Sequence, residues 1–226
     1  MGGTTAKTCV IEGGKPSVSN NIEVARVHRF KRGSGLPIVI PVLDLIEIGS
    51  GGGSIAWVDT GGVLKVGPES AGADPGPACY GVGDDATVTD ANVVLGYIDP
   101  KFFLGGEMHL DKKRAHEVIQ RKVAEPTGMS VEQAAAGIVR IANANMIRAI
   151  KRVSIERGHD VRDFSLIPFG GAGGLHAGQL MEELGMRRAI VPFLLGSRQK
   201  TGDILKSYNR NIKSITETAV IKRIVS

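Results

Sequence analysis

The order of apolar and polar positions divides the chain into a β-rich first third and a helical second half. In the first third, β-branched residues recur in short runs that alternate with polar residues, which is typical of half-buried strands. Two glycine-containing turns, Glu12-Gly13-Gly14-Lys15 and Asp59-Thr60-Gly61-Gly62, are of the kind that closes hairpins. The pattern predicts strands at residues 4–11, 22–30, 37–41, 54–58 and 63–66.

Residues 67–90 follow a different pattern. The run from Gly67 to Gly81 holds too many glycines and prolines for a helix or a central strand. A loop of this length inside a compact domain is usually either functional or disordered. Cys79 and Tyr80 are residues that pack inward, and they favour an ordered loop.

The second half is predicted to be helical. Asp111 can cap a helix that runs to about Val123. Ser130 with Gln133 three residues later forms a capping box, and apolar residues then recur at helical spacing. This predicts a long amphipathic helix that ends near Arg157.

A βαβ unit follows. Phe164–Pro168 has the composition of a buried strand, a glycine cluster opens a helix that ends near Leu184, and Arg188–Pro192 forms the next strand. Ligands bind at the strand-to-helix ends of such units. No internal repeat is apparent.

Three glycine clusters lie beside predicted strands or helices. Glycine lets a ligand approach the backbone closely, and backbone N–H groups at a helix start attract anions. Three clusters together indicate a polyphosphate ligand. The alternatives are a fraying terminal hairpin for the first cluster and close helix–strand packing for the third. The candidate binding residues are Gly2, Gly3, Thr4 and Thr5, then Gly51, Gly52 and Gly53, and last Gly170, Gly171, Gly173 and Gly174.

Four carboxylates are candidates for catalysis or for holding a metal. Glu47 stands beside the second glycine cluster, where it is either an ordinary exposed acid or a ligand of Mg²⁺ through water. Asp74 is a second candidate metal ligand, and Asp59 and Asp90 are candidate catalytic residues. Asp90 also suits a helix N-cap before Ala91, and this structural role is the favoured interpretation.

Two further residues carry reactive groups but favour structural roles. His176 stands alone just after the third glycine cluster, without a companion at metal-ligand spacing. Cys79 is interpreted as a small packed thiol rather than a nucleophile. Cys9 lies far from Cys79 in sequence, so neither a disulfide framework nor a zinc site is indicated.

Charge and composition exclude several classes of partner. The net charge of +5 comes from residues 197–226, which hold seven basic and two acidic side chains, whereas residues 1–196 hold 21 of each. With 4% aromatic residues and a neutral body, nucleic-acid binding is not expected. No apolar run is long enough for a membrane span, and no signal peptide opens the chain. We expect a soluble, cytoplasmic protein with reduced thiols.

Five sequence motifs resemble the hydantoinase A/oxoprolinase family when taken together. The family includes ATP-dependent N-methylhydantoinase, 5-oxoprolinase and the corresponding subunits of acetone carboxylase. The run from Gly-Pro-Glu-Ser to Cys-Tyr-Gly is the most distinctive, and the resemblance covers residues 1–195. The motifs are Met1-Gly-Gly-Thr-Thr-Ala-Lys, Ile48-Gly-Ser-Gly-Gly-Gly-Ser-Ile-Ala, Val66-Gly-Pro-Glu-Ser-Ala-Gly-Ala-Asp-Pro-Gly-Pro-Ala-Cys-Tyr-Gly, Thr87-Val-Thr-Asp-Ala-Asn and Phe169-Gly-Gly-Ala-Gly-Gly-Leu-His-Ala.

The resemblance implies an α/β fold of the actin-like ATPase type, in which two ribonuclease-H-like halves close on ATP and a divalent metal, magnesium or manganese. It implies that a lactam, imide or ketone oxygen is activated by phosphoryl transfer, with a hydantoinase B-type subunit or domain as partner, and an oligomer is expected. Gly2–Thr5 match the family's second phosphate loop, and Gly170–Gly174 match its adenosine-side motif.

Two departures from the family pattern suggest a piece of a longer enzyme. The acidic residue that precedes the family's glycine–threonine motif has no counterpart before Met1, and the first phosphate loop of an upstream half is missing. The expected organisation is an incomplete ATPase domain at residues 1–196 and a weakly packed or disordered basic tail at 197–226, outside the family pattern. The expected function is ATP-dependent opening of a cyclic amide or imide, with a noncatalytic nucleotide-binding or subunit-assembly module as the alternative.

Overall fold

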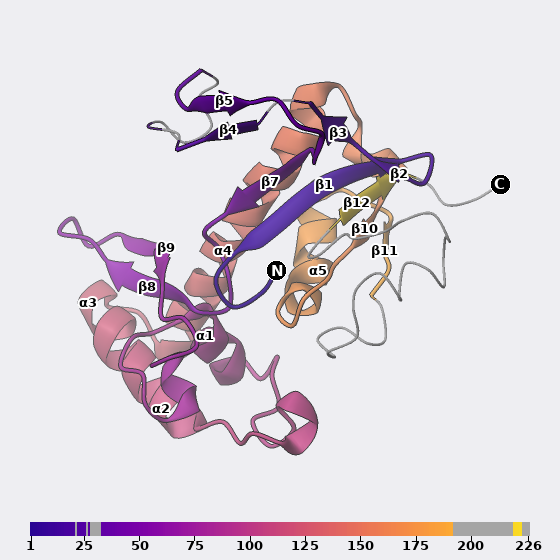
Figure 1. Cartoon of the computed structure of the whole chain (residues 1–226). Helices are drawn as coiled ribbons and strands as arrows, with labels where there is room; N and C mark the ends of the chain where they lie inside the picture. Colours follow the sequence, from indigo (N-terminus) through magenta and orange to yellow (C-terminus); the bar gives the residue numbers. More distant parts are fainter. Residues whose placement is uncertain (21, 26, 28–32, 192–218, 223–226) are drawn as a thin grey trace.

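The computed structural model describes residues 1–20, 22–25, 27, 33–191 and 219–222. The chain forms an α/β fold, as expected, in which a mixed sheet packs with two helices and a second lobe holds a hairpin and shorter helices (Figure 1). None of the helices in the described ranges is both long and apolar enough to cross a bilayer.

The sheet is built around the first predicted strand. β1 (Ala6–Glu12) pairs antiparallel with β2 (Lys15–Pro16) through the predicted turn, and antiparallel with β7 (Leu45–Ile48). Its other edge pairs in parallel with β12 (Ala219–Lys222). β10 (Phe164–Ile167) then pairs antiparallel with β12 and parallel with β11 (Arg188–Ala189). The order of the main path is β11-β10-β12-β1-β2.

Short hairpins extend from the sheet at the top of Figure 1. β4 (Ile22–Val24) pairs with β5 (Leu36–Ile38), so the described part of the predicted strand 22–30 is shorter than expected. The remainder of that prediction lies mostly outside the described residues. β3 (Val18–Ser19) pairs with β6 (Val42–Leu43).

The second lobe contains the predicted second hairpin and a group of helices. β8 (Ser54–Val58) pairs with β9 (Leu64–Ser70), which confirms this hairpin and extends its second strand. A helical run follows the predicted Asp111 cap, which accepts a hydrogen bond from the Arg114 N–H. The helical segments of this lobe are the 3₁₀ turns Ala78–Tyr80 and Leu104–Gly106, α1 (Val88–Val94), α2 (Lys112–Ile119), the π-helical turn Gln120–Ala124 and α3 (Glu125–Thr127).

The long helix α4 (Val131–Val153) connects the two parts of the fold and contacts β1, β7, β9 and α1. The predicted capping box is confirmed, because Ser130 and Gln133 exchange side chain-to-backbone hydrogen bonds. Its apolar face lies in the core with side chains such as Ile138 and Ile150 fully buried. The predicted end near Arg157 is wrong by one turn, because Ser154 leaves helical geometry and a 3₁₀ turn (Ile155–Arg157) follows.

The predicted βαβ unit is confirmed. The third glycine cluster links β10 to α5 (Gly173–Leu184), Gly185 ends the helix with a left-handed conformation, and β11 lies parallel to β10. Another 3₁₀ turn, Val161–Asp163, leads into β10. The turn between β10 and α5 therefore opens at the end of the sheet where α/β folds bind ligands.

The basic tail differs from the sequence-based expectation in one segment. Residues 219–222 form β12 at the centre of the sheet, between β1 and β10, so the prediction of a weakly packed tail is wrong there. Backbone pairing with two neighbouring strands gives even a short segment a defined register. The rest of the tail lies outside the described residues.

Candidate functional site

The structure brings the three glycine clusters together. The Gly52 N–H donates to the Gly2 carbonyl at 2.9 Å, and the Gly53 N–H donates to the Gly3 carbonyl at 2.6 Å. On the other side of this segment, the Met1 nitrogen donates to the Phe169 carbonyl at 2.7 Å. The first cluster therefore lies between the second and the third, joined to each by main-chain hydrogen bonds.

Some of these glycines are required for packing. A Cβ added at Gly51 would lie 2.5 Å from the carbonyl carbon and oxygen of Gly3. Gly170 has a φ of +80°, and a Cβ there would overlap the Met1 carbonyl oxygen. For Gly51 and Gly170 the packing interpretation is therefore sufficient, since no larger residue fits the observed backbone.

Other glycines face open space. No heavy atom lies within 4 Å of a Cβ built on Gly3 or Gly171. Both residues line a cavity of about 1040 Å³, together with Gly2 and Gly52. Within the described residues, the N–H groups of Gly3 and Gly171 donate to no protein acceptor. Two main-chain donors of the cavity lining are thus without an acceptor among the described residues.

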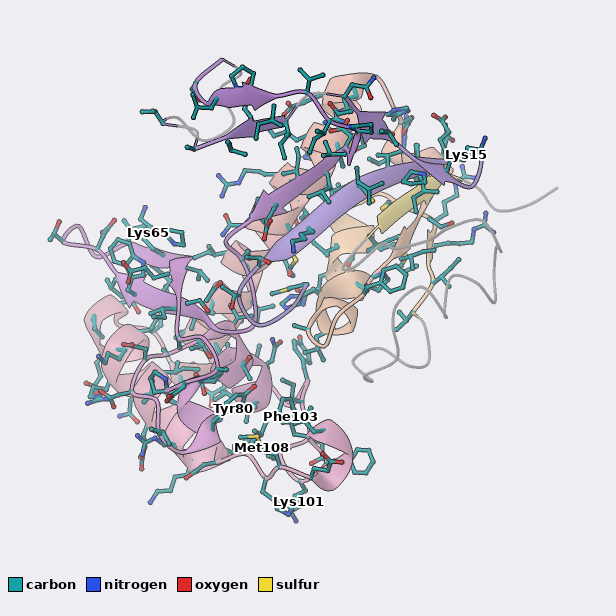
Figure 2. All side chains as sticks on the ribbon, in the orientation of Figure 1. Lys15, Lys65, Tyr80, Lys101, Phe103 and Met108 are labelled. Atoms are coloured by element: carbon teal, nitrogen blue, oxygen red, sulfur yellow. The ribbon has the colours of Figure 1, made fainter. Side chains whose placement is uncertain are left out.

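An aromatic wall borders the same cavity as these glycines, which form its glycine floor. Tyr80, Tyr97, Phe102 and Phe103 line the same cavity. The rings of Tyr80 and Phe103 lie 5.8 Å apart and are tilted, and Figure 2 shows them side by side in the lower lobe. Sequence reasoning missed this wall. The available signal was three aromatic residues within residues 97–103, in a chain where only 4% of residues are aromatic.

Several polar side chains also line the cavity. Thr89 closes one side, where its N–H and hydroxyl both donate to the Gly52 carbonyl at 2.7 and 2.9 Å. Asn92 is buried, and its Nδ2 donates to the Val88 carbonyl while its Oδ1 has no partner within the described part of the chain. An unsatisfied buried acceptor at a cavity wall is a ready contact for a ligand donor.

The carboxylates at this cavity are not the four predicted ones. Asp99 and Glu107 line it, and Asp99 accepts a hydrogen bond from the Lys101 N–H at 2.9 Å. Within the described ranges no three His, Cys, Asp or Glu residues are placed to hold a metal ion. Asp99 and Glu107 are both exposed at the cavity.

Asp90 has a structural position. The predicted N-cap role is corrected by the structure: Thr87 is the N-cap of α1 and Asp90 is its partner in a capping box. The fully buried Asp90 carboxylate accepts hydrogen bonds from the Thr87 N–H and hydroxyl and from the N–H groups of Ala78 and Cys79, at 2.7–3.2 Å. Through these hydrogen bonds Asp90 holds the 67–81 loop against α1.

Asp59 forms the turn between β8 and β9. Its carboxylate accepts from the N–H groups of Val63 at 2.9 Å and Gly61 at 3.0 Å, and lies 3.6 Å from the Lys65 ammonium. These contacts, led by the Val63 N–H, hold the pKa of Asp59 below its usual value. Asp59 does not line the glycine cavity.

The two predicted metal ligands also lie outside the cavity lining. Glu47 is paired with Lys7 across β1 and β7, with the ammonium and carboxylate 3.7 Å apart. Asp74 is exposed in the 67–81 loop.

His176 and Cys79 are buried, as the structural interpretation requires. The His176 Nδ1 lies 2.7 Å from the Asn143 Oδ1, and its Nε2 has no partner in the described part of the chain. Burial, together with the charge of the Met1 amino group, lowers the pKa of His176 to about 4. Burial and the nearby Asp90 carboxylate raise the pKa of the Cys79 thiol, so this cysteine is not an activated nucleophile.

Comparison with known proteins identifies the family. The hydantoinase/oxoprolinase model matches residues 1–205, which extends past the expected domain boundary at residue 196. The chain belongs to the hydantoinase/oxoprolinase family.

Relatives with solved structures share the α/β fold of this chain. The caprolactamase alpha subunit of Pseudomonas jessenii is 44% identical over 206 residues, which cover 91% of this chain and 28% of that protein. The crystal structure of ATP-dependent caprolactamase from the same organism superposes with a TM-score of 0.69 at 42% identity, covering 85% and 28% of the two chains. Nucleotide-free acetone carboxylase superposes with a TM-score of 0.73 at 30% identity, covering 85% and 26%. The chain thus spans between a quarter and a third of the length of these relatives.

Proposed function

We propose that this chain supplies part of an ATP-dependent enzyme that opens a cyclic amide or imide of the hydantoin, 5-oxoproline or caprolactam type. Family membership and the ATP-dependent caprolactamase relative support this proposal. The observation that carries it is the meeting of three glycine clusters at one cavity, where the N–H groups of Gly3 and Gly171 donate to no acceptor among the described residues. A subunit in the cytoplasm fits the two free, buried cysteines.

In this proposal the nucleotide phosphates bind over Gly2, Gly3, Gly52 and Gly171. The first turn of α5 borders the cavity through Leu175, so its positive dipole end adds to the attraction for phosphate. The aromatic wall offers ring faces against which a purine base can stack. We also propose that the fold is of the actin-like ATPase type, with the other half of the nucleotide site outside this chain.

Bound ATP would supply the phosphoryl group that activates the carbonyl oxygen of the substrate. The glycine turns would orient the phosphates and stabilise charge through fixed N–H donors. Asp99 and Glu107 would hold magnesium or manganese together with the phosphates. Because Asp59 and Asp90 are engaged elsewhere and Glu47 and Asp74 lie outside the cavity lining, we do not assign the nucleotide chemistry to them.

The partner would be a hydantoinase B-type subunit or domain that completes the reaction in an oligomer. Relatives named as the caprolactamase alpha subunit and the acetophenone carboxylase gamma subunit belong to enzymes of more than one subunit. The substrate would be a small molecule with a cyclic amide or related carbonyl group.

Gly171→Val tests the nucleotide site. The position has open space around its Cβ and no positive φ, so the substitution fills the cavity without displacing protein atoms. We expect ATP affinity, measured by calorimetry, to fall at least 100-fold, which corresponds to about 2.7 kcal/mol. The matched control is Gly178→Val, an exposed position on α5 that also has no neighbour within 4 Å. Equal ATP affinity in the two folded variants would overturn the proposed site.

The second candidate is a nucleotide-binding or assembly module without catalysis of its own. It is favoured by the structural engagement of Asp59 and Asp90, the two predicted catalytic carboxylates. The two candidates are separated by assaying cyclic amide opening with ATP, using the chain alone and then the chain with a hydantoinase B-type subunit. Turnover in either mixture favours the enzyme, and ATP binding without turnover in both favours the module.

A further inference from the structure

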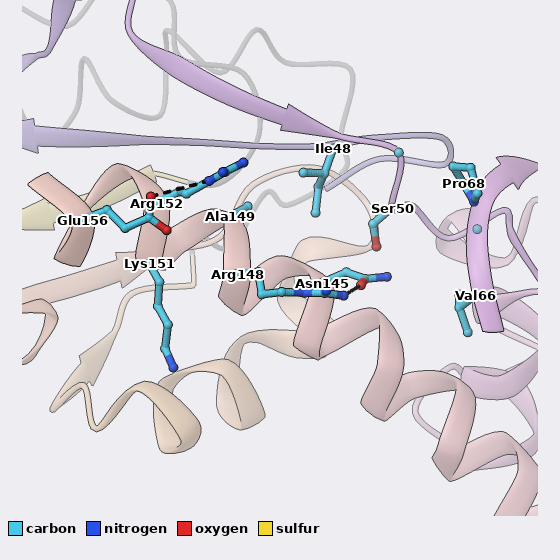
Figure 3. A pocket seen from close by; sticks show the side chains of 12 residues that line it. Ile48, Ser50, Val66, Pro68, Asn145, Arg148, Ala149, Lys151, Arg152 and Glu156 are labelled. Carbon is cyan, nitrogen blue, oxygen red and sulfur yellow. Dashed lines mark hydrogen bonds and ion pairs between the residues drawn. The ribbon is translucent and has the colours of Figure 1, made fainter. Parts of the chain in front are cut away.

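A second cavity lies away from the glycine floor and shares no lining residue with it. It has a volume of about 630 Å³, within the range of small-molecule sites. Its walls are the end of β7 with Gly49 and Ser50, the middle of β9 around Val66–Pro68, and the C-terminal half of α4 (Figure 3). Three elements far apart in sequence therefore enclose one concave surface.

Positive charge dominates the α4 side of this cavity. Arg148 and Arg152 lie one helical turn apart, and Lys151 also belongs to the lining, with its side chain directed away from Ser50 in Figure 3. Arg148 donates to the Asn145 side-chain oxygen, and Arg152 lies 3.6 Å from the Glu156 carboxylate. Without Lys151, two arginines and one carboxylate still leave an excess of positive charge at this wall. An anion is the ligand that such a wall attracts.

Ser50 supplies an independent indication of a ligand. The residue is 2% exposed, and its Oγ has no hydrogen-bond partner in the described part of the chain. Figure 3 shows the hydroxyl directed toward the part of α4 that carries Asn145 and Arg148. Buried hydroxyl groups are normally paired, so an unpaired one at a cavity wall is expected to meet a ligand or water.

The other lining residues are apolar. Ile48, Val66, Pro68 and Ala149 complete the wall between the arginines and the β9 strand. A ligand with only charge, such as inorganic phosphate, would leave this surface unused, whereas a carboxylate on a short hydrocarbon body would contact it. Two guanidinium groups and a hydroxyl are suited to a carboxylate head.

We propose that this cavity is a binding site for a small carboxylate with an apolar body, separate from the nucleotide site. The carboxylate accepts hydrogen bonds from the Ser50 hydroxyl and the Arg148 guanidinium, and Arg152 adds long-range attraction. The hydrocarbon body lies against Ile48, Val66 and Ala149. This inference does not depend on the proposed hydrolase activity.

The test is a binding titration of the 226-residue chain with butyrate, inorganic phosphate and butylamine, followed by NMR line shifts. Butylamine is the charge-reversed match of butyrate, and phosphate is the oxyanion without a hydrocarbon body. We expect butyrate to bind tightest of the three. Arg148→Gln should weaken butyrate at least tenfold, whereas Arg140→Gln, an exposed arginine on the same helix outside the cavity, should leave it unchanged.

Ser50→Ala is the second variant, because it keeps every charge. We expect a several-fold loss of butyrate affinity with a thermal midpoint equal to or above that of the parent chain, since an unpaired buried hydroxyl is removed. Equal effects of Arg148→Gln and Arg140→Gln would overturn the proposal. So would butylamine binding as tightly as butyrate, phosphate binding more tightly than butyrate, or no binding of any probe.

Discussion

Protonation of His176 should destabilise the fold in mildly acidic solution. The side chain is 1% exposed, and burial lowers its pKa from 6.5 to about 4. Asn143 donates through its amide nitrogen to Gln179, so its oxygen is the acceptor that faces the His176 Nδ1. The proton of the neutral ring therefore sits on Nδ1. A second proton on Nε2 would find no acceptor among the described residues.

The sign and size of the effect follow from linkage. The unfolded chain takes up a proton near pH 6.5 and the folded chain only near pH 4, so acid favours the unfolded state between these values. Stability is fully present above pH 6.5 and falls as the pH drops toward 4. Between pH 7 and pH 5 the loss from this one group is about 2 kcal/mol. For a chain of this size the thermal midpoint would drop by roughly 4–8 °C.

The assay is thermal unfolding followed by circular dichroism at pH 7, 6 and 5. His176→Gln removes the titrating group and should flatten the pH dependence by about 2 kcal/mol over this range. His109→Gln is the control, because His109 is exposed. Acidic residues that titrate between pH 7 and pH 5 affect the parent chain and the two variants alike. The difference in pH dependence between the two variants therefore isolates the contribution of His176. A His176→Gln variant that loses as much stability as the parent chain would refute the reasoning.

Three further predictions concern the framework of the site. Asp90→Asn should lower stability by about 3 kcal/mol, because an amide cannot accept from all the donors around the carboxylate, whereas exposed Asp74→Asn should change the urea midpoint little. Deleting residues 219–226 should lower the thermal midpoint because β12 is lost from the sheet centre, and an unchanged midpoint would contradict that role. The loop at residues 67–81 should resist limited proteolysis while the chain is folded, since Cys79 is buried and its N–H is bonded to Asp90, and early cleavage there would show a loose loop.

Local sequence signals predicted the local elements well. Ser130 with Gln133, the Asp111 cap and the glycine turn before α5 each act within a few residues, so their outcome is readable from the sequence. The strand at residues 219–222 was missed because its register depends on two partners far away in the chain. Asp90 was assigned to the right kind of role but the wrong cap position, since Thr87 competes for the same helix end.

The site was predictable only in part, because it also depends on contacts between residues that are far apart in the sequence. A glycine cluster in a sequence predicts that other atoms lie close to the backbone there, but it does not show which atoms these are. In the structure Gly51 and Gly170 are filled by neighbouring backbone, whereas Gly3 and Gly171 remain open toward the cavity. Three of the four aromatic residues of the wall and the carboxylates Asp99 and Glu107 come from residues 97–107, outside the three glycine clusters. Only the folded chain brings this segment and the glycines to one cavity.

Some glycines are required for packing and others are open to the cavity. Together they explain how the glycine turns can be rigid and still bind a ligand. Gly51 and Gly170 allow the backbones of the three clusters to meet at distances that side chains would prevent, and main-chain hydrogen bonds then fix them. This rigidity holds Gly3 and Gly171 in the cavity lining, where their N–H groups donate to no acceptor among the described residues. Fixed donors need no reorganisation when an anion arrives, and preorganisation of this kind is the main source of electrostatic stabilisation in enzyme sites. A substitution at the packing glycines should therefore damage the fold, and one at the open glycines should damage binding alone.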